Sequence, residues 1–248
     1  MGQARRRLPR RPRTLEASLT SCDAAILTAV YDHYDTLKPA LPQAGLAVEW
    51  VLVTDDPEIP DGHLGWRVLH RPAPGVTPMR AAKAPKFRPW RFTGAPASVW
   101  VDASCRVTSP TLARDFLAKA DPVATFAHRF WDCAYREAEI SAAMPKYDGE
   151  PVAAQAAAYR RAGHPEHWGL WETTVLARHH TAAVRALGDA WAAEAAAWSC
   201  QDQVSFPFVL REAGLRPAGL PGGRDGSPWH VYAGSGRHDD RMRAEEVS

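Results

Sequence analysis

The chain has 248 residues, of which 46% are apolar and 23% are charged, a composition typical of one globular domain with or without a small appendage. No segment approaches the roughly 20 apolar residues of a membrane span, so we expect no span. The four cysteines are scattered without a Cys-x-x-Cys motif, which indicates neither a zinc site nor disulfides and favours a reducing, cytoplasmic setting.

The formal net charge of +2 is unevenly distributed along the chain. Six arginines lie within residues 5–13, and without them 24 Lys and Arg stand against 28 Asp and Glu. We predict a basic, disordered arm over residues 1–23, a folded domain over 24–234 and a polar tail over 235–248. The arm lacks the apolar core of a signal peptide. The acidic balance of the domain argues against nucleic acid as its main ligand.

Three buried strands are predicted in the first third of the chain, at Ala24–Val30, Val48–Thr54 and Trp66–His70. The first two run into polar loops, at residues 31–35 and 55–57. In open α/β sheets, such loops at the carboxyl ends of strands hold the ligand-binding groups. The sequence contains neither G-x-G-x-x-G nor a P-loop motif, so it supports neither a dinucleotide-binding fold nor a P-loop enzyme.

Residues 78–92 concentrate basic side chains, and the three-residue spacing of Arg80, Lys83 and Lys86 predicts that they share one helical face. A cationic face beside a strand-end carboxylate is suited to holding a diphosphate. The alternative is a solvated basic helix, interrupted by Pro85 and Pro89. In isolation, this alternative is the simpler interpretation.

The segment 98–104 (SVWVDAS) is an apolar, β-branched strand that ends in Asp102, one spacer and Ser104. Many nucleotide-sugar glycosyltransferases carry two acids at this spacing, which directs both side chains to one divalent ion beside a diphosphate. Here a serine stands in place of the second acid. The alternative is a buried strand whose terminal Asp caps the next turn.

The second half of the chain alternates predicted helices and strands, without an internal repeat or a second domain. The predicted helices cover residues 109–120, 133–144, 153–163 and 181–198, and a further helix is predicted to begin within residues 199–206 and to end at about residue 213. The predicted strands cover residues 123–128, 173–178 and 228–234.

The loop at residues 163–172 is rich in aromatic and titratable side chains, which is the composition of a sugar pocket because pyranose rings stack on apolar planes. His164 and His167 have no third ligand nearby in sequence, so we do not expect a metal there. Gln201 and Gln203 flank Asp202 at a predicted helix start. These three residues either cap that helix or point into a pocket.

Taken together, these segments resemble a family of predicted GT-A-type glycosyltransferases of bacteria and plants, linked in plants to pectin and mucilage synthesis and long catalogued as a domain of unknown function. The resemblance covers residues of about 24–212 in consistent order. Gln201 stands where the family often has an arginine, and Pro85 interrupts the basic helix. The residues that carry the resemblance are Thr28–Leu37, Trp50–Asp56, Trp100–Ser104, His128, Glu137, Gln155, Gly169–Glu172 and Gln201–Phe206.

The resemblance implies a single α/β, GT-A-like domain with a mixed central sheet flanked by helices. It also implies a nucleotide-diphosphate sugar donor, with UDP as the first choice, and Mn²⁺ or Mg²⁺. The stretch at 201–203 and His230 are similar to glycogenin-like transferases, in which a C-terminal histidine completes the metal site. The expected metal ligands are therefore Asp102, Ser104 and His230. The other residues expected at the donor are Thr28, Tyr31, Tyr34, Asp35, Asp55, Arg80, Lys83 and Lys86.

For sugar transfer, a positioned carboxylate must stabilise the oxocarbenium-like centre or take the acceptor's proton. Asp202 with Gln203 is our first candidate, and Glu172 or His128 is expected to serve the acceptor, an unidentified glycan, protein or small molecule. The glycogenin-like features favour retention of configuration. The residues expected to line the sugar and acceptor pocket are Glu137, Trp168, Gly169 and Leu170.

Three other functions remain as alternatives. A catalytically inactive sugar- or protein-binding relative is suggested by Ser104, although such a relative is expected to have lost Asp102 or Asp202 as well. A metal phosphoesterase would require a second group of closely spaced acids and histidines. Nucleic-acid binding rests on the basic arm alone.

Overall fold

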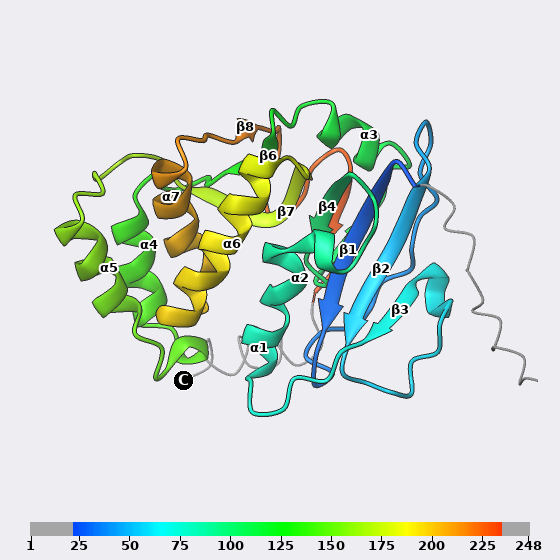
Figure 1. Cartoon of the computed structure of the whole chain (residues 1–248), viewed down its shortest axis with the longest axis horizontal. Helices are drawn as coiled ribbons and strands as arrows, with labels where there is room; N and C mark the ends of the chain where they lie inside the picture. Colours follow the sequence, from blue (N-terminus) through cyan, green and yellow to red (C-terminus); the bar gives the residue numbers. More distant parts are fainter. Residues whose placement is uncertain (1–21, 235–248) are drawn as a thin grey trace, which may run out of the picture.

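A seven-stranded mixed sheet forms the centre of the fold in the computed structural model, which describes residues 22–234 (Figure 1). The strand order is β3-β2-β1-β4-β7-β6-β8. The four strands β1 to β4 are mutually parallel, whereas β7 runs antiparallel to both β4 and β6. The bounds are β1 Ala24–Val30, β2 Val48–Thr54, β3 Arg67–His70, β4 Ala97–Val101, β6 Val123–Ala127, β7 Trp171–His179 and β8 Ala218–Gly219.

Helices cover both faces of this sheet. The helix α3 packs with alternate residues of the central strands, such as Ile26 and Val99, on one face. On the other face, α2, α6 and α7 pack against Leu27 and Trp100. The side chains of these two residues point to this face because successive side chains of a strand alternate between the two faces of the sheet. The bounds are α1 Pro78–Ala81, α2 Lys83–Phe87, α3 Leu112–Leu117, α4 Ala134–Ala142, α5 Val152–Arg161, α6 Ala182–Ala197 and α7 Asp202–Glu212.

The predicted strands and helices are present with small shifts of their ends. The basic stretch forms two short helices, α1 and α2, separated at Ala82, instead of one. The helix α3 begins at Leu112, three residues after the predicted start at residue 109. The sequence did not predict the two-residue strand β8, which lacks enough residues to show a periodic pattern.

A second, two-stranded sheet changes the direction of the chain directly after β4. The backbone N–H of Cys105 donates a hydrogen bond to the carbonyl oxygen of Asp102, 2.9 Å away, and closes a turn. The chain continues into β5 (Cys105–Val107), which pairs antiparallel with β9 (His230–Tyr232). This turn places Asp102 at the end of the central strand, outside the buried part of the sheet.

The expected arm and tail lie almost entirely outside the described residues. No helix within residues 22–234 is long and apolar enough to cross a membrane.

Candidate functional site

A pocket lies at the carboxyl ends of β1 and β4. These two parallel strands are neighbours at the centre of the sheet, and β1 connects to β2 on its other side. In open α/β sheets, ligands bind at this kind of topological switch point. The pocket therefore lies where the fold class predicts a ligand.

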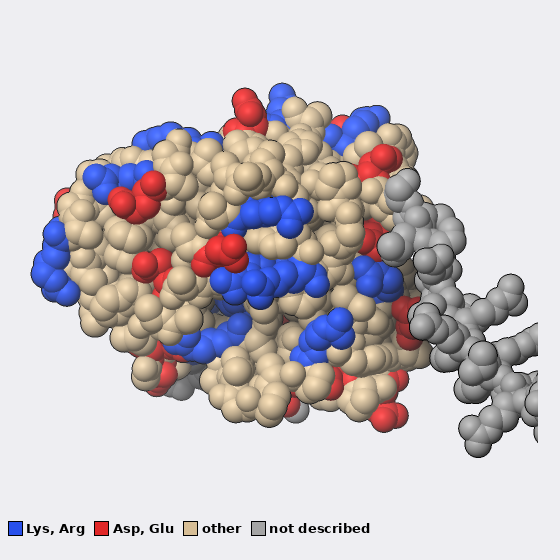
Figure 2. Space-filling view, viewed as in Figure 1, with Lys and Arg blue, Asp and Glu red and all other residues tan. Residues whose placement is uncertain are grey.

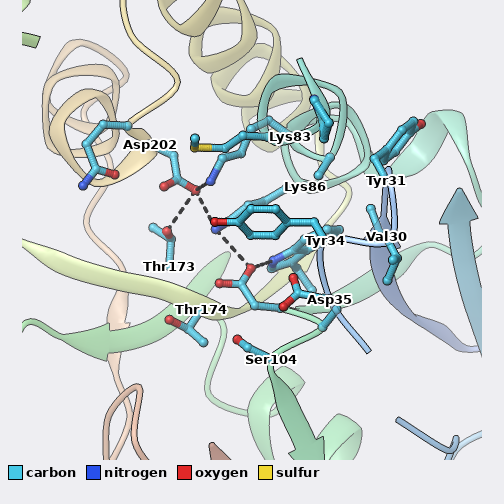
Figure 3. A pocket seen from close by; sticks show the side chains of 18 of the residues that line it. Val30, Tyr31, Tyr34, Asp35, Lys83, Lys86, Ser104, Thr173, Thr174 and Asp202 are labelled. Carbon is cyan, nitrogen blue, oxygen red and sulfur yellow. Dashed lines mark hydrogen bonds and ion pairs between the residues drawn. The ribbon is translucent and has the colours of Figure 1, made fainter. Parts of the chain in front are cut away.

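An ion cluster of two carboxylates and two lysines occupies the wall of the pocket (Figure 3). The Nζ atom of Lys86 lies 2.5 Å from Oδ2 of Asp202 and 3.4 Å from Oδ1 of Asp102. The Nζ atom of Lys83 lies 3.0 Å from the same Oδ2 of Asp202. Thr173 donates a hydrogen bond of 3.2 Å to that oxygen. The cluster therefore joins a residue that follows a central strand to one that starts a helix.

Burial and opposite charge together determine the ionisation of this cluster. Burial alone would raise the pKa of Asp202, but Lys83 and Lys86 outweigh burial and hold this pKa well below its usual value. Burial also disfavours the charged form of Lys83, but the carboxylates of Asp202 and Asp102 outweigh it and raise the pKa of Lys83. Asp202 is consequently a permanent anion near neutral pH.

The buried position of Lys86 excludes the solvated basic helix as its environment. Lys86 is only 2% exposed, and its ammonium group reaches the pocket from α2. The buried guanidinium group of Arg178 on β7 donates a hydrogen bond of 2.6 Å to the backbone carbonyl of Lys86. Burial lowers the pKa of Arg178 to about 9. Arg178 therefore fixes the backbone from which Lys86 extends.

Two further cations line the pocket, and our sequence predictions did not include them. Lys146 comes from the 3-10 helix Pro145–Tyr147, and Arg224 comes from the loop before β9. Neither forms an ion pair with another described residue of the chain. Burial lowers the pKa of Lys146, and the positive charges of Arg224 and Lys83 lower it further. Uncompensated positive charge in a pocket is typical of an anion site.

Most of the donor residues predicted from the sequence come together at this pocket. Tyr31, Tyr34 and Asp35 follow β1 and line it; Tyr34 and Asp35 lie beside the ion cluster, whereas the ring of Tyr31 points away from it (Figure 3). Asp102, Ser104, Asp202 and Gln203 line it from the other elements.

Three predicted donor residues lie elsewhere. Arg80 forms an ion pair of 2.5 Å with Glu150 and donates to backbone carbonyls at the end of α6, so its positive charge is used in a structural contact. Asp55 accepts a hydrogen bond of 3.0 Å from the backbone N–H of Asp32. Thr28 is 1% exposed and borders a small cavity beneath the pocket.

The predicted acceptor residues do not line the pocket. His128 and Glu137 face each other, with Nε2 and Oε2 3.8 Å apart. Glu137 also accepts a hydrogen bond of 2.9 Å from Gln201, a pocket residue, so it supports the pocket from behind. The carboxylate of Glu172 accepts a hydrogen bond from the backbone N–H of Arg224. Glu172 therefore holds the loop that carries Arg224.

The aromatic loop is also packed outside the pocket. The ring of Trp168 contacts the guanidinium group of Arg216, with 4.5 Å between the group and the ring centre. Leu170 is 3% exposed. Gly169 has a φ of 128° and lies directly against the ring of Trp171, so its backbone position leaves no space for a side chain.

The predicted donor set available for a divalent ion consists of the carboxylate of Asp102 and the hydroxyl group of Ser104, in a pocket that Asp35 and Asp202 also line. Over residues 22–234 no three acidic, histidine or cysteine side chains gather as a metal site. Mg²⁺ in nucleotide sites usually has one or two protein carboxylates and takes its other ligands from phosphates and water, so this set fits an ion that binds with a diphosphate.

His230 does not contribute to this donor set. Its side chain is completely buried, and its Nδ1 lies 2.7 Å from the hydroxyl oxygen of Ser227. Its ring packs on Phe126, with 5.5 Å between ring centres. We therefore do not retain His230 in the metal site.

Comparison with known proteins identifies the family. A search of curated proteins finds no match to this sequence. A family model described as "TOD1/MUCI70, glycosyltransferase-like domain" matches residues 61–217, which is more than half of the chain and includes Lys83, Lys86, Asp102 and Asp202. The match confirms the family resemblance found in the sequence, and the mixed central sheet with flanking helices is consistent with a GT-A-like domain. The chain belongs to the TOD1/MUCI70 family of glycosyltransferase-like domains.

Proposed function

We propose that this protein is a glycosyltransferase that binds a nucleotide-diphosphate sugar in the pocket at the ends of β1 and β4 and transfers the sugar to an acceptor. The observation that carries the proposal is the combination of Asp102 and Asp202 with two cations, Lys146 and Arg224, that form no ion pair with another described residue, at the switch point of the sheet. A nucleotide-sugar donor has a matching division of charge, because its diphosphate is anionic and its sugar becomes cationic during transfer.

We assign the diphosphate to the side of the pocket formed by Lys146 and Arg224. Neither side chain forms an ion pair with a carboxylate of the described residues, and guanidinium groups bind phosphate oxygens in pairs. Tyr34 lines the pocket after β1 and offers aromatic surface to the nucleoside, whereas Tyr31 is only 5% exposed and donates its hydroxyl hydrogen bond to the carbonyl oxygen of Arg71. UDP remains our first choice of nucleotide.

We also propose that Mn²⁺ or Mg²⁺ binds with the donor, held by Asp102 and Ser104. When bound, the ion supplies Lewis-acid neutralisation of the diphosphate. Lys86 lies beside Asp102 and provides positive charge at the same position. Trp100 donates a hydrogen bond of 2.5 Å to Oδ1 of Asp102 and fixes the orientation of this carboxylate.

We assign Asp202 to the sugar. Its low pKa makes it a poor proton acceptor near neutral pH, because an effective general base has a pKa close to the working pH. A permanent negative charge is instead suited to stabilising the positive centre that develops at the sugar carbon. This role favours retention over inversion, as the sequence resemblance suggested.

The test is the release of free nucleotide from a panel of UDP- and GDP-sugars, with water as the acceptor, together with nucleotide binding by calorimetry. Asp202→Asn should bind the nucleotide normally and release it at least about 100-fold more slowly, the usual scale for an electrostatic catalytic group. The matched control is Glu139→Gln, which removes an exposed carboxylate on α4. Full turnover by Asp202→Asn would refute the role of Asp202. Nucleotide binding without turnover for any donor would favour the inactive binding relative.

A further inference from the structure

A second cavity lies between α2 and the second half of α6, on the face shown in Figure 2. Its volume is about 350 Å³, within the range of small-molecule sites. Apolar side chains form most of its wall. The residues that contribute apolar surface are Val76, Ala84, Phe87, Phe92, Ala192 and Ala196.

The rim of the second cavity carries positive charge. Figure 2 shows lysine and arginine side chains across the middle of this face, where α2 lies beside α6. Arg80, Lys83 and Arg88 line the cavity, but each forms an ion pair with a carboxylate. Arg91 is exposed and has no ion pair within the described part of the chain. Arg91 is therefore available to a ligand.

The rim also exposes apolar surface. Val76 is 48% exposed and is one of three large apolar residues with such exposure among residues 22–234. Exposed apolar surface beside a concave, apolar wall is typical of a binding site. An uncharged apolar ligand would leave Arg91 unused, whereas inorganic phosphate alone would leave the apolar wall uncovered. The combination therefore favours a ligand with both properties.

We propose that the second cavity binds a small amphiphile, with an aliphatic or aromatic body against α2 and α6 and one anionic head group, a carboxylate or a phosphate, at Arg91. This site is a different cavity from the donor pocket, although the two adjoin at Lys83, and the proposal does not depend on the proposed transferase activity. Lys83 lines both cavities, so the two sites share one side chain.

The test measures the binding of octyl phosphate, octanoate and octanol to the full chain by calorimetry, at concentrations below micelle formation. We expect saturable binding of at least one of the two anions, and the stronger of them identifies the head group. Octanol should bind about fivefold more weakly, the upper end for one exposed ion pair. Absence of saturable binding of both anions, or equal affinity for octanol and the anions, would overturn the proposal.

Two pairs of variants locate the site. Ala196→Phe fills the cavity from an exposed position of α6 and should abolish binding, whereas Ala193→Phe, also exposed on α6 but outside the cavity, should not change it. Arg91→Ala should weaken the binding of the anions about fivefold and leave octanol unchanged. Arg106→Ala, which removes an exposed arginine on β5, is the control. Unchanged anion binding in both Ala196→Phe and Arg91→Ala would refute the site.

Discussion

The substitution Lys86→Met tests the ion cluster most sharply, because methionine preserves most of the buried volume and removes only the charge. Lys86 is 2% exposed and contacts both Asp102 and Asp202. Breaking a buried ion pair by removing one partner usually costs about 3–5 kcal/mol. Here Lys83 still contacts Asp202 at 3.0 Å, so the carboxylate is not left alone. We therefore expect a smaller loss of about 2 kcal/mol, typical of one charged hydrogen bond.

The assay is urea unfolding at neutral pH, with thermal unfolding as a second measurement. A loss of about 2 kcal/mol should lower the melting temperature by about 4–8 °C in a protein of this size. Lys119→Met removes an exposed lysine that follows α3 and should change stability by less than about 0.5 kcal/mol.

A double-mutant cycle isolates the contact itself. If the cost arises from the lost contact between Lys86 and Asp202, then Asp202→Asn should be less destabilising in the Lys86→Met background than in the wild-type protein. Strictly additive effects, or wild-type stability of Lys86→Met, would refute the ion cluster as we describe it.

Two further substitutions, at His164 and Gly188, test buried positions outside the ion cluster. His164 is 4% exposed, and burial lowers its pKa to about 4, so the folded state excludes a proton that the unfolded state accepts below about pH 6.5. The free energy of unfolding should therefore decrease by up to about 3 kcal/mol as the pH falls from 6.5 to 4, and His164→Leu should remove this part of the pH dependence. Urea unfolding at pH 7 and pH 4.5 measures the change. An equal change in the wild-type protein and in His164→Leu would contradict the burial of a neutral His164. Gly188→Ala adds a methyl group against the carbonyl oxygen of Phe87, where α6 meets α2. The substitution should lower the free energy of unfolding by about 1–3 kcal/mol, although alanine has the better helix propensity. Increased thermal stability of Gly188→Ala would show that α2 does not approach α6 this closely.

The sequence was most informative where hydrophobic patterns end in polar groups. The runs at Ala24–Val30 and Ala97–Val101 are buried along their whole length, so the pattern placed them at the centre of the sheet. Because parallel strands share one carboxyl edge, the residues that follow them, such as Tyr31 and Asp102, had to lie together. These residues do line one pocket.

The sequence was least informative for cations that reach the pocket from irregular segments. Lys146 and Arg224 lie far apart along the chain, and no periodic pattern relates them. The glycines around Arg224, in the stretch 222–226 (GGRDG), were an available signal, because glycine-rich loops allow a backbone to approach an anion closely. Arg80 illustrates the opposite error. Its helical spacing predicted that it lies beside Lys83, but the spacing could not predict that Arg80 pairs with Glu150 while Lys83 pairs with Asp202 in the pocket.

The most direct test of the donor site is the thermal stability of the purified protein with UDP or GDP, each with and without Mn²⁺. A nucleotide at about 100 times its dissociation constant should add about 2.7 kcal/mol and raise the melting temperature by about 5–10 °C. We predict that this rise requires both one nucleotide and the metal, and that Asp102→Asn removes it. No rise with any pair, or an undiminished rise in Asp102→Asn, would contradict the assignment of the pocket to a metal-bound nucleotide diphosphate.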